Sequence, residues 1–310
     1  MKSLLTLVLV ALTAGCAAAV AMAQPMPADA AAPTLLRDGS KLKLASANVL
    51  VFDAGIGQPI YAKGADALTP IASVTKLMTA MVVLDGAQSL DDALEVGMAD
   101  LDMLKGSHSR LRLGTELTRR DMLRIALMAS ENRAASSLAR HYPGGTEAFV
   151  QAMNQKAQSL GMTHTHFADP TGLSSENVST ANDVARMVQA AAGYAPIREF
   201  TTTASHYVEL QPTGQLLGFN NTNSLVKSGA WDIQVSKTGF IREAGKCLVM
   251  LATIASRPVI IVLLDSLGRL TRIGDANRVK HWLETGEAMP QTAARQAPKV
   301  KHTRTIAARG

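Results

Sequence analysis

Three short groups of residues have the side-chain types and spacing that covalent catalysis by a serine requires. The first is Ser73-Val74-Thr75-Lys76. Residues three apart on a helix share one face, so the hydroxyl of Ser73 and the amine of Lys76 can meet. A serine hydroxyl needs a base, and a lysine serves as one only when burial or a nearby cation lowers its pKa. Near the start of a helix, backbone N–H groups also favour negative charge at Ser73.

The second group is Ser130-Glu131-Asn132, which we expect between a helix that ends near residue 129 and one that begins near residue 133. The hydroxyl of Ser130 could relay a proton to a leaving amine. The amide of Asn132 could hold a substrate amide with one donor and one acceptor. Residues 175–177 repeat the same tripeptide in a loop. We favour the first copy, because it joins two helices that can pack rigidly against the predicted Ser73 helix.

The third group, Lys237-Thr238-Gly239, lies on a predicted strand that precedes two apolar strands. A glycine there lets a substrate backbone lie against the strand edge. Lys237 and Thr238 can bind a carboxylate. Lys237 also brings a cation near Lys76, which helps to keep that amine neutral. Taken alone, the tripeptide equally fits a surface strand that ends in a turn glycine.

The remaining pattern predicts the elements that must position these groups. A strand at 46–53 and a short strand through 60–61 form a hairpin, and Pro70 opens a helix that closes at residues 85–86. Thr118 with Asp121, and Thr180 with Asp183, are typical of helix starts. Strand character returns near 205–210, 232–240, 247–255 and 258–264, and a last helix covers 273–283. This order predicts an α+β fold, an antiparallel sheet flanked by helices with an all-helical lobe inserted at about residues 88–192.

The N-terminal residues predict export. Lys2 precedes an uncharged apolar stretch, and Ala-Met-Ala at 21–23 fits a signal peptidase site. We therefore expect a signal peptide at 1–23 and a periplasmic protein. The tetrapeptide that ends at Cys16 resembles a lipoprotein box, which leaves lipid attachment there as the alternative. Cleavage after Ala23 leaves Cys247 as the one cysteine, and its apolar surroundings predict a buried thiol.

Composition and charge divide the rest of the chain. With 47% hydrophobic and 18% charged residues among 310, the chain is typical of a globular protein. We expect a linker at 24–43, a catalytic domain at 44–285 and a basic, disordered tail at 286–310. Residues 288–310 hold five Lys or Arg and no acidic residue, out of a net charge of +6. Such a tail is either simply solvated or a tether to an anionic envelope polymer; export argues against nucleic acid as a partner.

With the three groups in this order, the chain resembles the penicillin-recognising serine DD-peptidases over roughly residues 44–285. The stretches 71–80 and 166–173 are similar to the D-alanyl-D-alanine carboxypeptidase and endopeptidase group. The glutamate inside Ser130-Glu131-Asn132 is similar to the endopeptidase branch, the low-molecular-mass penicillin-binding proteins. Many carboxypeptidases of the group carry an extra C-terminal β-domain, and the 71 residues after Gly239 leave no room for one.

The resemblance implies a β-lactamase/transpeptidase-like fold and a hydrolase that needs no cofactor or metal. Its substrates would be D-Ala-containing peptide bonds of peptidoglycan stem peptides, above all the D-Ala–diaminopimelate cross-link, and β-lactams would be covalent inhibitors. The implied roles are a nucleophile at Ser73, a base at Lys76, a proton relay at Ser130 and a holder of the acyl donor at Asn132. The substrate carboxylate would bind Lys237 and Thr238 beside Gly239, and the backbone N–H groups of Ser73 and Phe240 would bind the oxyanion.

Other functions are compatible with parts of the pattern. A D-alanyl-D-alanine carboxypeptidase, a serine β-lactamase or a non-catalytic wall-binding protein could share the three groups. An α/β-hydrolase is disfavoured, because no G-x-S-x-G occurs. Gly239 and Gly245-Lys246 are one residue too far apart for a phosphate-binding loop. His164 and His166 have no evident third ligand, so we expect structural roles for both.

Overall fold

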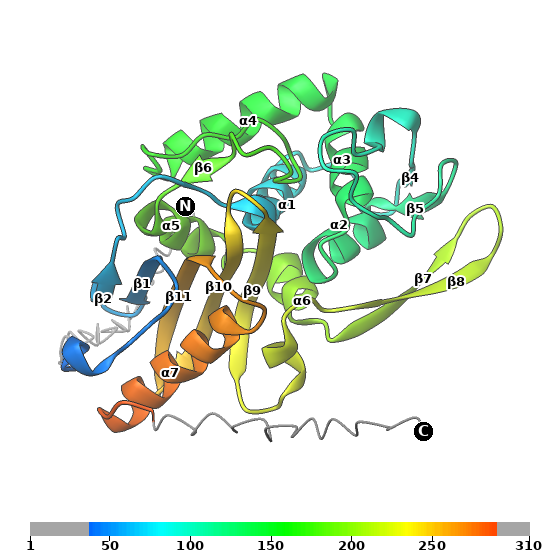
Figure 1. Ribbon diagram of the computed structural model, residues 1–310. Coiled ribbons are helices and arrows are strands. Elements are labelled where there is room, and N and C mark those ends of the chain that lie inside the picture. The colour runs from blue at the N-terminus through cyan, green and yellow to red at the C-terminus, as the bar shows by residue number, and fades with distance from the viewer. Residues whose placement is uncertain (1–36, 290–310) are drawn as a thin grey trace, which may run out of the picture. The chain divides into compact units, whose positions relative to one another are not determined.

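The centre of the fold is a five-stranded antiparallel sheet, seen in a computed structural model that describes residues 37–289 (Figure 1). The strand order is β2-β1-β11-β10-β9. The bounds are β1 (Asn48–Asp53), β2 (Gln58–Lys63), β9 (Asp232–Ile241), β10 (Gly245–Ile254) and β11 (Arg257–Ser266). In the register Asn48 lies opposite Leu264, so the first strand of the sheet pairs with the last. Strand β9 forms one edge, and the predicted α+β fold is confirmed.

The sheet separates two hydrophobic cores, because successive side chains of a strand point to opposite faces. On β1, Val49 and Val51 pack with Trp282 of helix α7 (Thr271–Thr285). Leu50, between them, lies in the larger core on the opposite face. Helix α5 (Ala181–Ala191) contacts β1 and β11, and helix α7 contacts β10 and β11.

Within residues 37–289, six helices lie beside the larger core, together with three short strand pairs. The helices are α1 (Lys76–Asp85), α2 (Arg119–Met128), α3 (Asn132–Arg140), α4 (Gly145–Ser159), α5 (Ala181–Ala191) and α6 (Ala195–Thr202). The short pairs are β3 (Thr69–Pro70) with β6 (Val178–Ser179), β4 (Ala93–Glu95) with β5 (Glu116–Thr118), and β7 (Ser205–Leu210) with β8 (Gln215–Asn220). The 3-10 turns are η1 (Gly39–Lys41), η2 (Ala72–Thr75), η3 (Met98–Asp100) and η4 (Ser224–Lys227).

Most predicted helix starts are confirmed. The Thr118 side chain accepts a hydrogen bond from the backbone N–H of Asp121 at the start of α2. Thr180 does the same for Asp183 at the start of α5. These bonds satisfy backbone donors that have no partner within the helix.

The predicted helix from Pro70 is wrong at its start. Pro70 pairs with Val178 in β3–β6, and α1 begins only at Lys76. Between them the chain forms the 3-10 turn η2, which carries Ser73. Ala72 takes a φ of 47°, a left-handed value that costs energy for a residue with a side chain. The backbone before Ser73 is therefore held by tertiary contacts, and local helix propensity does not determine it.

The described end of the predicted linker packs on the domain. Leu42 is buried in the core beneath α7, and Arg37 donates a 2.7 Å hydrogen bond to the carbonyl of Leu283. The predicted signal peptide with Cys16, residues 24–36 of the linker and residues 290–310 of the tail lie outside the described residues. Among residues 37–289, none of the helices combines the length and apolarity needed to span a bilayer.

Candidate active site

Three segments that are distant in the sequence bring the predicted catalytic side chains together. Ser73 lies on η2 and Lys76 is the first residue of α1. Ser130 and Asn132 lie at the junction of α2 and α3, and Lys237 lies on β9. Figure 1 shows β9 running towards α1, and β9 contacts the turn η2.

Lys76 is buried among three hydrogen-bond acceptors. Its Nζ lies 3.0 Å from Ser73 Oγ, 2.7 Å from Asn132 Oδ1 and 2.6 Å from the carbonyl oxygen of Thr171. Burial lowers the pKa of Lys76 to about 8, although the carboxylates of Asp169 and Glu131 act in the opposite direction. Lys76 thus combines contact with the Ser73 hydroxyl and a readily accessible neutral form, the two properties that a base requires.

A second lysine contacts a second serine. Lys237 is buried, and its Nζ donates hydrogen bonds to Ser130 Oγ at 2.9 Å and to the carbonyl of Thr238 at 3.0 Å. Burial, together with the positive charges of Lys76 and Arg272, lowers the pKa of Lys237 well below its usual value. Ser130 itself has a φ of 61°, so the α2–α3 junction holds this hydroxyl in a conformation that side-chain-bearing residues rarely adopt.

Asn132 is oriented by partners on both sides of its amide. Its Oδ1 accepts from Lys76, and its Nδ2 donates to Ser107 Oγ at 3.0 Å. The Ser107 loop is in turn held by Asp102, whose carboxylate accepts from the backbone N–H groups of Leu104 and Ser107. The loop before β5 therefore fixes which end of the Asn132 amide faces Lys76.

Two glycines press against the backbone of the Ser73 turn. A Cβ at Gly172 would lie 2.0 Å from the carbonyl oxygen of Ala72, and Gly172 has a φ of 81°. A Cβ at Gly239 would lie 2.9 Å from the carbonyl of Ile71 and 3.2 Å from the backbone nitrogen of Ser73. Only glycine allows both approaches. The closeness of Gly239 also places the backbone of Ser73 beside that of Phe240, the two predicted oxyanion-binding groups.

Residues near Lys237 offer hydrogen-bond donors that could bind the carboxylate of a substrate. Thr238 Oγ1 lies 2.6 Å from Thr222 Oγ1. Arg272, in the first turn of α7, is close enough to Lys237 to affect its pKa. The Nε and Nη1 atoms of Arg272 are buried and have no hydrogen-bond partner among residues 37–289. A buried guanidinium with free donors is suited to an anionic ligand.

The repeated tripeptide at 175–177 has a different environment. Asn177 is buried, and its Nδ2 donates to Thr75 Oγ1 at 3.0 Å while its Oδ1 accepts from the backbone N–H of Ala168. Ser175 is exposed. This copy therefore braces the loop behind η2, and only the first copy contacts Lys76 and Lys237.

An open cleft of about 550 Å³ leads to Ser73. Its other lining residues are Leu104, Lys105, Ser107, Asn132, Leu173, Phe240, Ile241, Arg242 and Glu243. Phe240 is 59% exposed, and Lys246 Nζ lies 4.0 Å from the centre of its ring.

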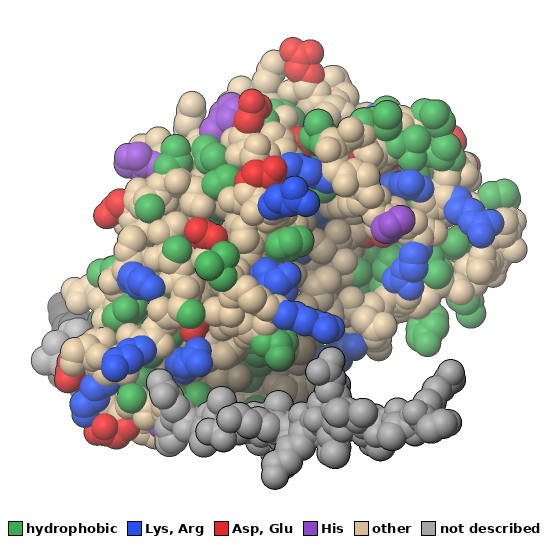
Figure 2. Space-filling model, viewed as in Figure 1, with side chains coloured by type: hydrophobic (Ala, Val, Ile, Leu, Met, Phe, Trp, Pro, Cys, Tyr) green, Lys and Arg blue, Asp and Glu red, His purple; other side chains and the backbone are tan. Residues whose placement is uncertain are grey.

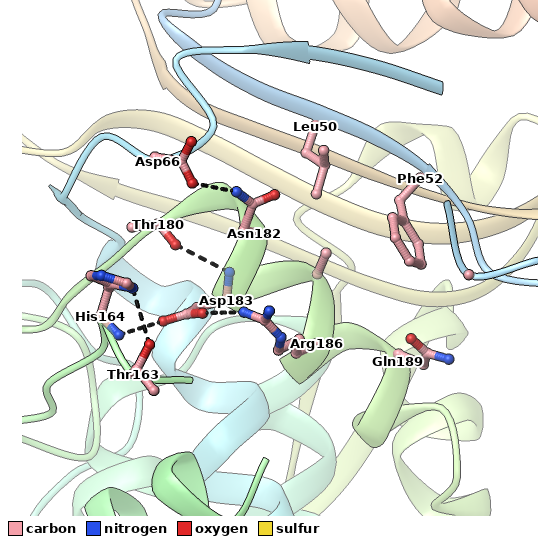
Figure 3. Close-up of a pocket in the computed structure, with 12 residues that line it drawn as sticks. Leu50, Phe52, Asp66, Thr163, His164, Thr180, Asn182, Asp183, Arg186 and Gln189 are labelled. Atoms are coloured by element: carbon pink, nitrogen blue, oxygen red, sulfur yellow. Dashed lines mark hydrogen bonds and ion pairs between the residues drawn. The ribbon is translucent and has the colours of Figure 1, made fainter. Parts of the chain in front are cut away.

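A separate pocket of about 430 Å³ contains none of the predicted catalytic residues (Figure 3). Its polar side chains bind one another: Asn182 donates to Asp66, and Asp183 accepts from Arg186 and from the backbone N–H of His164. His164 thus takes part in a structural network, and His166 pairs through its backbone with Val178. Residues 37–289 contain no group of three or more His, Cys, Asp or Glu placed to hold a metal ion.

Cys247 is fully buried, as predicted, and burial raises the pKa of its thiol to about 11.

Sequence reasoning missed Ser107, Thr171, Thr222 and Arg272. The stretch 166–173, which resembles the DD-peptidase group, was the one available signal for Thr171. Ser107 lies in an irregular loop, and Arg272 lies 199 residues after Ser73, just before the last predicted helix at 273–283, so no local pattern marks either residue.

The chain is similar to known proteins along most of its length. Residues 36–268 match the family model described as D-alanyl-D-alanine carboxypeptidase. A D-alanyl-D-alanine endopeptidase of Pseudomonas aeruginosa is 47% identical, over 84% of each chain. One from Escherichia coli is 44% identical, over 94% of each chain.

Solved structures agree with this match. The Streptomyces K15 DD-transpeptidase superposes with a TM-score of 0.73 at 29% identity, covering 78% of this chain and 98% of that one. Penicillin-binding protein D2 from Listeria monocytogenes, in its ampicillin-bound form, gives a TM-score of 0.68 at 28% identity with the same coverage. The predicted transpeptidase-like fold is confirmed, and this chain belongs to the D-alanyl-D-alanine carboxypeptidase family of serine peptidases.

Proposed function

We propose that this protein is a periplasmic serine endopeptidase that cuts D-Ala–diaminopimelate cross-links between stem peptides of peptidoglycan. The proposal depends most on the buried contact between Ser73 Oγ and Lys76 Nζ, 3.0 Å apart, where the amine has a pKa of about 8. Relatives at 47% and 44% identity that are named endopeptidases support the choice of bond.

Acylation would begin at Ser73. Its Oγ forms a bond to the carbonyl carbon of D-Ala while its proton passes to the neutral Nζ of Lys76. Backbone N–H groups of Ser73 and Phe240 stabilise the negative oxygen of the intermediate. The C–N bond then breaks, and the departing nitrogen takes a proton through Ser130 Oγ. Water releases the acyl group by the same proton transfers in reverse order.

The leaving group would be recognised by its carboxylate. In a diaminopimelate cross-link, the carbon that carries the scissile nitrogen also carries a free carboxylate. This carboxylate would bind Thr238, Lys237 and the unpartnered donors of Arg272, which lies close enough to Lys237 to lower its pKa. Terminal D-Ala presents the same carboxylate, so a carboxypeptidase reaction remains the second candidate, supported by the description of the family model.

The products distinguish the two reactions. We expect the mature protein to convert cross-linked muropeptide dimers to monomers faster than it releases D-Ala from pentapeptide monomers. A dominant release of D-Ala, with dimers left intact, would make the protein a carboxypeptidase. The Ser73→Ala variant is the inactive control for this product assay. It should also lose covalent labelling by penicillin while it keeps the native circular dichroism spectrum. Labelling of another serine in this variant would refute the assignment of the nucleophile. Rapid turnover of penicillin by the wild type would instead indicate a β-lactamase.

Location and tethering are part of the same proposal. Removal of residues 1–23 should leave Gln24 as the first residue of the exported protein, which N-terminal sequencing tests; a lipid on Cys16 would refute this cleavage. The basic segment 288–310 would hold the enzyme near an anionic envelope polymer through charge attraction. A chain truncated after residue 287 should then elute from a polyanion column at lower salt, with peptidase activity unchanged.

A further inference from the structure

The mouth of the Ser73 cleft carries three charged residues from two segments. Lys105 lies on the loop that precedes β5, and Arg242 and Glu243 follow β9. Figure 2 shows Lys and Arg side chains gathered along the middle of the face that displays this end of β9 and β10. The mouth is therefore a charged surface directly connected to the catalytic serine.

Two of these three charged side chains form an ion pair with each other, and the third has no ion-pair partner among the described residues. Lys105 Nζ and Glu243 Oε1 lie 2.6 Å apart, and their side chains are 32% and 41% exposed. Arg242 is exposed and has no hydrogen bond or ion pair with another described residue. An exposed ion pair is weak, so a ligand that offers similar charges can replace it. The mouth thus has one anionic and two cationic groups available to a zwitterion.

The site determines which part of a substrate reaches this mouth. Strand β9 is an edge of the sheet and runs from Lys237 towards Ile241. A peptide whose leaving-group carboxylate lies at Lys237 and whose scissile carbonyl lies at Ser73 must run antiparallel to β9. Its residues before the scissile bond then pass Ile241 towards Arg242. The acyl-donor stem, and not the leaving stem, faces the charged mouth.

We propose that Arg242, Glu243 and Lys105 form a subsite for the free amino-acid head group of the diamino acid that precedes D-Ala in the donor stem. This inference rests on the proposed function. The head group of diaminopimelate carries an ammonium and a carboxylate on one carbon. Its carboxylate binds Arg242, where a planar guanidinium can donate two parallel hydrogen bonds. Its ammonium binds Glu243, and Lys105 moves from Glu243 to the same ligand carboxylate. A stem with lysine at this position offers the ammonium alone.

The test compares three peptides that end in D-Ala-D-Ala and differ in the preceding residue: diaminopimelate, diaminopimelate amidated at its free carboxyl, and lysine. Wild type should cut the first with a kcat/KM about tenfold higher than the other two, the effect of one charge-assisted contact. Arg242→Ala should remove this preference by lowering kcat/KM for the diaminopimelate peptide alone. Arg242→Lys should restore part of it.

Two controls separate the subsite from the fold and from the proposed function. Acylation by a small penicillin should be unchanged in Arg242→Ala, and Arg120→Ala, which changes an exposed arginine outside the cleft, should keep the preference. If the wild type cuts all three peptides equally, or if Arg242→Ala slows all three equally, the subsite is refuted while the peptidase function stands. A wild type that penicillin labels but that cuts neither these peptides nor cross-linked muropeptide dimers refutes both.

Discussion

Glu131 gives a direct test of how Lys76 works as a base. Its side chain is buried, caps α3 by accepting from the backbone N–H of Arg133, and raises the pKa of Lys76 by its charge. Glu131→Gln keeps the shape and the acceptor of the cap but removes the charge. The substitution therefore lowers the pKa of Lys76, because the ammonium loses a stabilising anion.

The size of the effect follows from the pKa of about 8. At pH 7 about a tenth of Lys76 is neutral, and only the neutral amine can accept the proton of Ser73. Acylation in the wild type should rise about tenfold per pH unit well below 8 and level off above it. In Glu131→Gln the rise moves to lower pH. The rate gain at pH 7 lies between one and about tenfold, since the neutral fraction cannot exceed one, and no gain is left at about pH 10.

The assay is the second-order rate constant for labelling by a fluorescent penicillin, measured from about pH 5.5 to about pH 10. The repeated tripeptide provides the matched control. Glu176→Gln makes the same change in an exposed copy, and Glu176 does not affect the pKa of Lys76, so its pH profile should match the wild type. A profile of Glu131→Gln that moves to higher pH, or an equal shift in both variants, would refute Lys76 as the titrating base.

Three further outcomes are expected. Ser130→Ala should slow penicillin acylation by about 10²-fold, the usual effect of losing a proton-transfer group, while Ser175→Ala should not; the reverse order would mean that the second copy is catalytic. Gly172→Ala should slow labelling of Ser73 and lower the free energy of unfolding, because its Cβ would lie 2.0 Å from the backbone carbonyl oxygen of Ala72; a variant with unchanged labelling rate and unchanged stability would contradict the described contact. Asp275→Ala should lower the free energy of unfolding, measured by urea titration, by about 3 kcal/mol, because the buried carboxylate accepts hydrogen bonds from Ala45, Ser46 and Arg278. A loss below about 0.5 kcal/mol would contradict that role.

Local patterns in the sequence predicted the elements whose determinants are local. The hairpin β1–β2 follows from a run of β-forming residues and a glycine turn, and α2 and α5 follow from their capping residues Thr118 and Thr180. The three-residue spacing of Ser73 and Lys76 similarly predicted that these two side chains meet.

Features that arise from distant contacts were not predictable. The turn η2 replaces a helix start because the backbones of Gly172 and Gly239 press against it from segments about 100 and 165 residues away. Arg272 joins the site through the packing of α7 on the sheet, and Ser107 through a loop shaped by Asp102. No short stretch of the sequence contains both partners of these contacts.

The pairing of β1 with β11 also determines when the enzyme can first become active. The proposed nucleophile, Ser73 on η2, is synthesised about 200 residues before Arg272, and the sheet lacks its middle strand until residues 257–266 have emerged. A nascent chain with Ser73 already exposed therefore has no β11 to connect β1 with β10 and no folded β9 edge beside Ser73. Contacts over such long separations form slowly. Hydrolytic activity is thus delayed until nearly the whole catalytic domain is available, and fragments cut short before β11 carry the nucleophile without an assembled site.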